Sequence, residues 1–344
     1  MTTLLLTGIG GPTPRAIARA LHRWPRHGEY RLVGADCDPH GLGLYEPLLA
    51  ASYTLPRADE PGYWDAIERL VAREKVKAAV VMPEAEVEVW AARKALPCPA
   101  AVPPLELVRL CRDRTALSQA LGELAPRTVG LADGLEAVMQ DLGFPCWLRA
   151  TGGAAGTGAL LAHSRDEAEA WLALQGEREM SASDFLPGRN LGCTLLYAHG
   201  EYLRSACFER LRYHMAKLVP SGVSGNISLG RLVHRTDVGE IAQQAVTRAA
   251  RAAKAMPHGV LTVDLKEDAA GQPLVTEINV RHVAPVSALV EGGATLVEDT
   301  VLLALGREAE IERGHHRFAR ELLILRDIDG EPRLLAESEL ASGP

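Results

Sequence analysis

The stretch Gly259–Arg281 reads GVLTVDLKEDAAGQPLVTEINVR and predicts two strands joined by a turn rich in Asp, Ala, Gly and Pro. Successive strand residues point to opposite faces of a sheet. One face therefore takes the mostly apolar residues Leu261, Val263, Leu265, Leu274, Thr276, Ile278 and Val280. The other face takes Asp264, Glu277, Asn279 and Arg281. If the strands pair about the turn, Asp264 lies directly across from Glu277.

Two carboxylates that face each other on apolar strands repel, so a cation is expected between them. Carboxylate and amide oxygens are the ligands that Mg²⁺ prefers, with substrate phosphates completing the shell. Asp264, Glu277 and Asn279 are therefore the candidate metal ligands, for Mg²⁺ or alternatively Mn²⁺. Arg281 shares their face and is a candidate to hold a transferring phosphoryl group. The alternative is an edge hairpin with a solvated polar face.

A glycine-rich segment, Thr151–Gly158, joins two further expected strands. Glycines let backbone amides approach a phosphate closely, although flexible β-turns are also glycine-rich. The segment is not a P-loop, because the Gly-Lys-Ser/Thr ending is missing. Arg149 precedes it and Arg114 begins an upstream helix, and both are candidate phosphate cations or ordinary surface residues. The candidate phosphate-binding glycines are Gly152, Gly153, Gly156 and Gly158.

The first hundred residues alternate between strand and helix patterns, which predicts a parallel sheet with helices on both faces. Four prolines in Pro97–Pro104 mark a boundary. Gly8–Pro12 follows the first strand like a dinucleotide-binding loop, but Thr13 stands where the third glycine belongs. Because Asp36 ends the second strand as a ribose-binding acid would, a nicotinamide oxidoreductase stays an alternative.

Beyond the prolines, strands and long helices follow without strict alternation, which predicts an α+β unit. Helices are expected over Leu135–Leu142 and Pro285–Leu305, among others, and a hairpin is expected to turn at His199-Gly200. The expected division is a parallel-sheet domain at 1–104, a small lobe with the glycine loop at 105–182, and a large lobe with the carboxylate hairpin at 183–344.

Composition narrows the class of protein. The 344 residues are 47% hydrophobic and 24% charged, and the net charge is -7. A negative charge argues against a nucleic-acid partner, and no apolar run is long enough for a membrane span. Six scattered cysteines without a CxxC pair predict a reduced, cytoplasmic protein with neither a disulfide framework nor a zinc site. Only six of the 37 basic residues are lysines. Arginines are therefore expected to do any chemistry that lysines usually do.

These pieces occur in the order found in the ATP-grasp superfamily, and most resemble the ATP-binding halves of the carbamoyl phosphate synthetase large subunit. The similar segments are LLLTGIGGPTPRAIARAL, CRDRTAL, CWLRATGGAAGTGAL, SDFLPGRNLGCTLLY, VPSGVSGN, VDLKED and VTEINVR. The resemblance implies a parallel-sheet domain followed by a two-lobed ATP-grasp fold. Most members carry lysines where Arg114 and Arg149 stand, whereas the carbamoyl phosphate synthetase branch carries arginines.

The resemblance also implies roles for individual residues. Arg114 and Arg149 would be the nucleotide cations, and Asp184, Phe185 and Leu186 would line the adenine. Gly222 would lie near the nucleotide. The family usually places a glutamate after the hinge to hold the ribose, but Arg189 and Asn190 stand here, and Asn190 is expected to bond a hydroxyl more weakly.

The implied activity is that of an ATP- and Mg²⁺-dependent ligase that joins a small carboxylate to an amine, with Arg281 and Asn279 as the catalytic residues. An amino-acid-like substrate is expected, because Glu84, Glu86 or Glu88 could receive an ammonium group and Arg210 or Arg212 a carboxylate. A charged helix start and a solvated surface are the alternatives for these two sets. The alternative functions are a phosphotransferase that makes an acyl or carbamoyl phosphate and a non-catalytic nucleotide-binding protein. A homodimer is expected.

Overall fold

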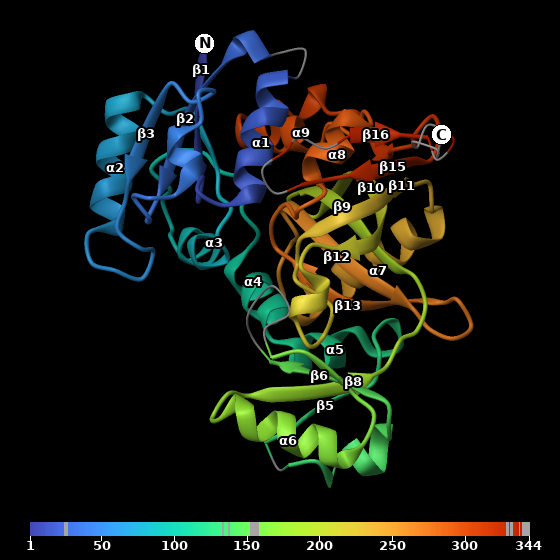
Figure 1. Ribbon diagram of the computed structural model, residues 1–344. Coiled ribbons are helices and arrows are strands. Elements are labelled where there is room, and N and C mark those ends of the chain that lie inside the picture. Colours follow the sequence, from blue (N-terminus) through green and yellow to red (C-terminus); the bar gives the residue numbers. More distant parts are fainter. Residues whose placement is uncertain are drawn as a thin grey trace, which may run out of the picture.

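The structure is a computed structural model that describes residues 1–23, 27–132, 134–136, 138–151, 158–327, 330, 333–336 and 338. The strands in these ranges form three sheets, one per region of the chain (Figure 1). A parallel sheet lies at the N-terminus, a small sheet lies at the opposite end of the molecule, and the largest sheet lies between them. This mixed architecture confirms the predicted fold class. The boundaries expected at 104/105 and 182/183 stay a prediction.

The N-terminal sheet is parallel, as predicted, with strand order β3-β2-β1-β4. Alternate residues of β1 pack on opposite faces: Leu5 joins the core with Trp90, and Leu6 joins the core with Ile17. Helices therefore cover both faces. The elements are β1 (Thr2–Thr7), α1 (Pro12–Arg23), β2 (Tyr30–Asp36), β3 (Ala51–Thr54), α2 (Tyr63–Glu74), β4 (Ala78–Val80) and α3 (Glu84–Ala91).

The small sheet has the order β5-β8-β6-β7 and is antiparallel at its described pairings. Ser164 accepts a hydrogen bond from the Glu167 amide and so caps α6, which lies against the sheet (Figure 1). Asp113 caps α5 in the same way through the Ala116 amide. The elements are α4 (Leu105–Arg112), α5 (Arg114–Leu121), β5 (Thr128–Gly130), β6 (Cys146–Ala150), β7 (Leu160–Ala162), α6 (Arg165–Gln175) and β8 (Met180–Asp184).

The largest sheet has the order β13-β12-β9-β10-β11-β15-β16, with β14 paired to β10. Helix α7 covers one face because its small and apolar residues recur at helical spacing, and they share a core with Cys193 and Val263. The elements are β9 (Asn190–Ala198), β10 (Glu201–Tyr213), β11 (Ile227–Val233), α7 (Thr236–Ala252), β12 (Gly259–Glu267), β13 (Pro273–Asn279), β14 (Gly314–His315), β15 (Leu322–Leu325) and β16 (Arg333–Leu335).

The β12–β13 hairpin pairs Asp264 directly with Glu277, as predicted, but its register shifts immediately afterwards. Leu265 pairs with Val275, so Thr276 is left over as a bulge residue. The prediction that Leu274 and Thr276 share the face of Leu265 is therefore wrong. Val275 is buried in the core with Leu265 instead.

Two expected helices differ from the structure. The helix predicted over Pro285–Leu305 is two helices, α8 (Val286–Glu291) and α9 (Leu296–Ala304), because the chain turns at Gly293, whose φ is +95°. In the segment predicted as a helix over Leu135–Leu142, the structure describes a π-helix at Val138–Leu142, and Ala137 lies outside the described residues. Within the described ranges, no helix is long and apolar enough to cross a membrane.

Candidate active site

A cavity of about 160 Å³ lies where the small sheet meets the hairpin. It is lined by both cationic candidates, by the segment expected to hold adenine, and by the facing carboxylates. The lining residues that the sequence singled out are Arg114, Arg149, Asp184, Phe185, Leu186, Asn190, Arg210, Asp264 and Glu277. The fold thus brings residues from separate parts of the predicted site to one cavity.

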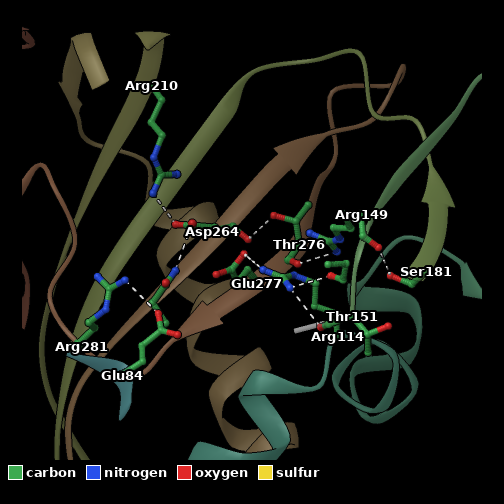
Figure 2. Close-up of polar contacts among 12 residues, drawn as sticks. Glu84, Arg114, Arg149, Thr151, Ser181, Arg210, Asp264, Thr276, Glu277 and Arg281 are labelled. Carbon is green, nitrogen blue, oxygen red and sulfur yellow. Dashed lines mark hydrogen bonds and ion pairs between the residues drawn. The ribbon is translucent and has the colours of Figure 1, made fainter. Parts of the chain in front are cut away.

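The two carboxylates each have an arginine partner (Figure 2). Arg210 Nη2 donates to Asp264 Oδ1 at 2.6 Å, and Arg114 Nη2 lies 3.3 Å from Glu277 Oε2. Asn279 Nδ2 donates to the other Asp264 oxygen at 3.3 Å. Burial raises the pKa of Asp264 and the neighbouring Glu277 adds to this, whereas Arg210 acts in the opposite direction. Asp264, Glu277 and Asn279 therefore form one oxygen-rich cluster.

Arg114 and Arg149 reach the hairpin from the side of the small sheet. Arg114 Nη1 donates to the carbonyls of Ala150 and Thr151 at 2.9 and 3.1 Å. Arg149 Nη2 donates to the Thr276 carbonyl at 3.1 Å, and its buried Nε has no partner among the described residues. Burial lowers the pKa of Arg149 to about 10, and the nearby charge of Arg114 contributes to this shift. Two closely placed cations of this kind favour an anionic ligand.

The glycine loop is only partly described. Gly152, Gly153 and Gly156 lie outside the described residues. Gly158 has a φ of +67°, which favours glycine, and its carbonyl accepts a hydrogen bond from Trp171 Nε1. Phosphate binding by this loop stays a prediction.

The segment expected beside adenine lines the cavity, and its contact with adenine stays a prediction. The Asp184 carboxylate is held by Arg127 through Nε at 3.0 Å and Nη2 at 2.8 Å, so it fixes the end of β8. Phe185 and Leu186 follow it on the cavity wall. Lys266 Nζ lies 5.3 Å from the centre of the Phe185 ring, and burial lowers the pKa of this lysine.

Asn190 lines the cavity but is already engaged with protein groups. Its Nδ2 donates to Tyr213 Oη at 2.7 Å, and its Oδ1 accepts from Arg210 Nη1 at 3.4 Å. Gly222 has a φ of +70° within the loop before β11, and its neighbour Val223 lines the cavity. Ribose binding by Asn190 stays a prediction.

A second cavity of about 270 Å³ lies on the other side of the carboxylate pair. Both cavities are lined by Arg210, Tyr213, Val223, Asp264 and Glu277. Arg281 lines the second cavity, and its Nη2 donates to Glu84 Oε1 at 3.0 Å (Figure 2). Glu84 begins α3, so the N-terminal domain reaches this side of the site.

Three other residues expected to bind substrate lie elsewhere. Glu86 is buried in the N-terminal domain, where burial raises its pKa to about 7. Glu88 pairs with Arg112, and Arg212 is exposed beside a register shift in β10. Glu86, Glu88 and Arg212 therefore line neither cavity, and substrate binding by one member of each set stays a prediction.

The first cavity is also lined by residues that the sequence had not assigned to the site, among them Tyr213, Lys266 and Thr276. Lys266 shares a strand face with Asp264, so strand parity could have identified it. Thr276 lines the cavity because of the bulge, and the sequence has no local signal for that bulge.

The loop Gly8–Pro12 after the first strand contacts Asp36, the residue considered as a ribose-binding acid. Asp36 Oδ2 accepts a hydrogen bond from the Gly10 amide at 2.8 Å, so this carboxylate oxygen stabilises the loop.

Comparison with known proteins gives no match to a family model and no match to a curated protein sequence. Solved structures do match over 94% of this chain. N5-carboxyaminoimidazole synthetase from Staphylococcus aureus complexed with ADP is 15% identical, with 82% of that chain covered and a TM-score of 0.73. L-amino acid ligase from Bacillus licheniformis is 16% identical, with 79% covered and a TM-score of 0.69.

A third similar structure is the biotin carboxylase domain of the Hydrogenobacter thermophilus 2-oxoglutarate carboxylase, in complex with MgADP, ADP and bicarbonate. It is 14% identical, with 74% of that chain covered and a TM-score of 0.70. The chain therefore has the fold shared by these solved structures. It is the ATP-grasp fold, as the sequence resemblance predicted. The closer resemblance to carbamoyl phosphate synthetase stays a prediction.

Proposed function

We propose that this chain is an ATP-dependent ligase that activates a small carboxylate as an acyl phosphate and joins it to an amine, releasing ADP and phosphate. The observation that carries the proposal is the pair of cavities that share Asp264 and Glu277 as a common wall. One cavity has the cations and apolar walls that suit a nucleotide. The other is lined by Arg281, which is held by Glu84, and it suits a small polar substrate.

The first cavity would take ATP. Arg114 and Arg149 would bind the phosphates, while Phe185 and Leu186 would contact the base. Structures that share the fold were solved with ADP or MgADP, which supports a nucleotide as the ligand of this chain. Asn190 would offer the ribose a neutral amide, so we expect a weaker sugar contact than a carboxylate would make.

The oxygen cluster fits a hard divalent ion, because Asp264, Glu277 and Asn279 supply two carboxylates and an amide on adjacent strands. Mg²⁺ held by these residues would neutralise charge on the phosphates, and Mn²⁺ has similar ligand preferences. Arg210 would keep Asp264 in place through its 2.6 Å hydrogen bond.

The second cavity would take the carboxylate to be activated. One of its oxygens attacks the γ-phosphorus, the bond to the ADP oxygen breaks, and an acyl phosphate forms. Such transfers depend on positioning and charge stabilisation. An amine then attacks the acyl carbon, a proton leaves the amine, and phosphate departs to give the amide. Arg281, oriented by Glu84, would stabilise the negative charge that develops on the reacting groups.

A mass-spectrometric turnover assay tests this proposal. The protein, Mg²⁺ and ATP are mixed with pooled amino acids and small carboxylic acids, and ADP, AMP and new masses are followed. We expect ADP together with a product equal to two substrates minus water. ADP without a condensed product would favour the phosphotransferase, and AMP would contradict an acyl-phosphate route.

The variant Glu277→Gln tests whether turnover depends on the hairpin. It removes a metal-ligating charge at nearly constant volume, so we expect turnover to fall about 10²-fold or more while the melting temperature stays close to that of the wild type. Glu240→Gln, at an exposed position of α7, is the matched control and should leave turnover unchanged. Near-normal activity in Glu277→Gln would refute the role of the hairpin.

A further inference from the structure

A second group of chemically reactive side chains lies on the far side of the largest sheet, away from the carboxylates. Asp264 pairs with Gly192, whereas Val263 pairs with Cys193, so the Cys193 thiol points to the opposite face, toward α7. Cys193 in turn pairs directly with Cys207 on β10. Both cysteines are fully buried.

His315 joins the two thiols through the short strand β14, which pairs with β10 at Ser205. The ligand atoms of Cys193, Cys207 and His315 all lie within 4.8 Å of one another. Two sulfurs and an imidazole nitrogen at this separation are close to the arrangement that a tetrahedral zinc ion requires. Three different strands supply these atoms, so the group depends on the tertiary fold.

The imidazole of His315 is held as metal-bound histidines usually are. Ser205 Oγ lies 2.9 Å from its Nδ1, and Tyr202 Oη lies 2.7 Å from Ser205 Oγ. The other ring nitrogen, Nε2, is buried and has no partner among the described residues. A ring fixed through one nitrogen while the other stays available is the usual outer-shell arrangement of a histidine ligand.

A fourth candidate ligand lies beside this group. His234 follows β11, and the centre of its ring lies 5.5 Å from that of the His315 ring, with the planes tilted by 44°. Its Nδ1 is also buried and without a partner in the part of the chain that the structure describes. Two unpartnered imidazole nitrogens beside two buried thiols are not explained by packing alone, because buried polar atoms are normally hydrogen-bonded.

We infer that Cys193, Cys207 and His315 form a structural site for a thiolate-binding transition metal ion, with zinc as the preferred ion and His234 or a water as the fourth ligand. The inference is independent of the proposed ligase activity. Binding displaces the two thiol protons, because the thiolate is the form that ligates the metal. The ion would tie β9, β10 and β14 together behind the sheet that carries the active site.

The prediction from sequence was the opposite, since none of the six cysteines forms a CxxC pair. Cysteine spacing along the chain could not reveal this group, because its members come from three strands whose register brings distant residues together. All six cysteines are free thiols in the structure, and Cys193 and Cys207 are two of them.

The test is metal analysis of the full chain, purified without chelators and then incubated with Zn²⁺ and desalted. We expect about one zinc ion per chain in the wild type and a loss of at least about tenfold in Cys207→Ser. Cys146→Ser, at a buried cysteine of the small sheet, and Cys37→Ser, at the exposed cysteine, are the matched controls and should keep the ion.

A second measurement keeps the inference testable if Cys207→Ser does not fold. The wild type loaded with Co²⁺ should show the sulfur-to-cobalt absorption band of a thiolate site, and Zn²⁺ should abolish it. A wild type that takes up no zinc, or whose intact mass reveals a Cys193–Cys207 disulfide, would overturn the inference. Zinc that is lost in Cys37→Ser but kept in Cys207→Ser would overturn it as well.

Discussion

Asp264 and Glu277 each form an ion pair with an arginine from a different element. A ligand that binds either carboxylate must displace that arginine or share it. Arg210 comes from β10 and Arg114 from the first residue of α5. An anionic nucleotide would offer Arg114 a second partner, while a divalent ion would replace its charge beside Glu277. A bound ligand would therefore replace or share the ion pairs that these carboxylates make with arginines in the structure.

Glu86 offers a prediction at the residue scale that is independent of the active site. Burial raises its pKa from 4.5 to about 7, so the folded state holds a proton in this interval that the unfolded state has released. The stability contribution is therefore present at low pH and is lost as pH rises between these values. The full loss is about 3 kcal/mol.

We expect Glu86→Gln to reduce this dependence and to raise the melting temperature at pH 8 relative to the wild type. Thermal unfolding between pH 5 and pH 8 is the measurement. Glu106→Gln, at an exposed position of α4, should follow the wild-type curve. Parallel curves for the wild type and Glu86→Gln would show that Glu86 does not titrate in this range.

At the scale of the element, the hairpin shows which side-chain directions can be predicted from strand alternation and which cannot. Alternation correctly predicted that Asp264 faces Glu277, because the pairing is regular from Thr262 to Asp264. It failed at Thr276, because one extra residue reverses the faces beyond a bulge. The break between α8 and α9 was missed because the apolar pattern continues through Gly292 and Gly293.

Gly259, the first residue of β12, supplies a prediction about close backbone approach. Its φ is +78°, and a Cβ there would lie 2.3 Å from the Ala101 carbonyl oxygen. Gly271 has a similar φ of +82° but nothing within 4 Å of its Cβ position. We expect Gly259→Ala to lower the free energy of unfolding by about 3 kcal/mol or more, against about 1 kcal/mol for Gly271→Ala.

Chemical denaturation of both variants measures the difference. Both positions have positive φ, so the two variants share the cost of backbone strain. The additional loss of unfolding free energy in Gly259→Ala is therefore due to the contact with Ala101. Equal losses would show that the chain accommodates the added methyl group. A larger loss in Gly271→Ala would contradict this account of the start of β12.

At the scale of the whole molecule, the site is assembled from the N-terminal domain, the small sheet and the large sheet. Sequence motifs identified Arg114, Arg149 and the two facing carboxylates among the residues that line the first cavity. They could not distinguish Glu84 from Glu86 and Glu88, since that choice depends on how α3 packs against the large sheet. The cluster at Cys193 depends in the same way on contacts between distant strands.

Glu84 tests the contribution of the N-terminal domain. It contacts Arg281, which lines the second cavity, at 3.0 Å, and it lines neither of the two cavities itself. We expect Glu84→Gln to lower kcat/KM for the carboxylate substrate about tenfold, equivalent to about 1.4 kcal/mol, while KM for ATP changes less than about twofold. Glu88→Gln is the matched control on the same helix, and an equal effect on both substrates would contradict the separation of the cavities.

The central claim is that phosphoryl transfer to a carboxylate occurs across Asp264 and Glu277. The most direct measurement supplies the turnover assay with substrates labelled with ¹⁸O in their carboxyl groups and analyses the phosphate released. The account predicts that phosphate gains one ¹⁸O atom for each amide formed, because the attacking carboxylate oxygen leaves with the phosphoryl group. Amide formation with unlabelled phosphate would contradict the acyl-phosphate mechanism.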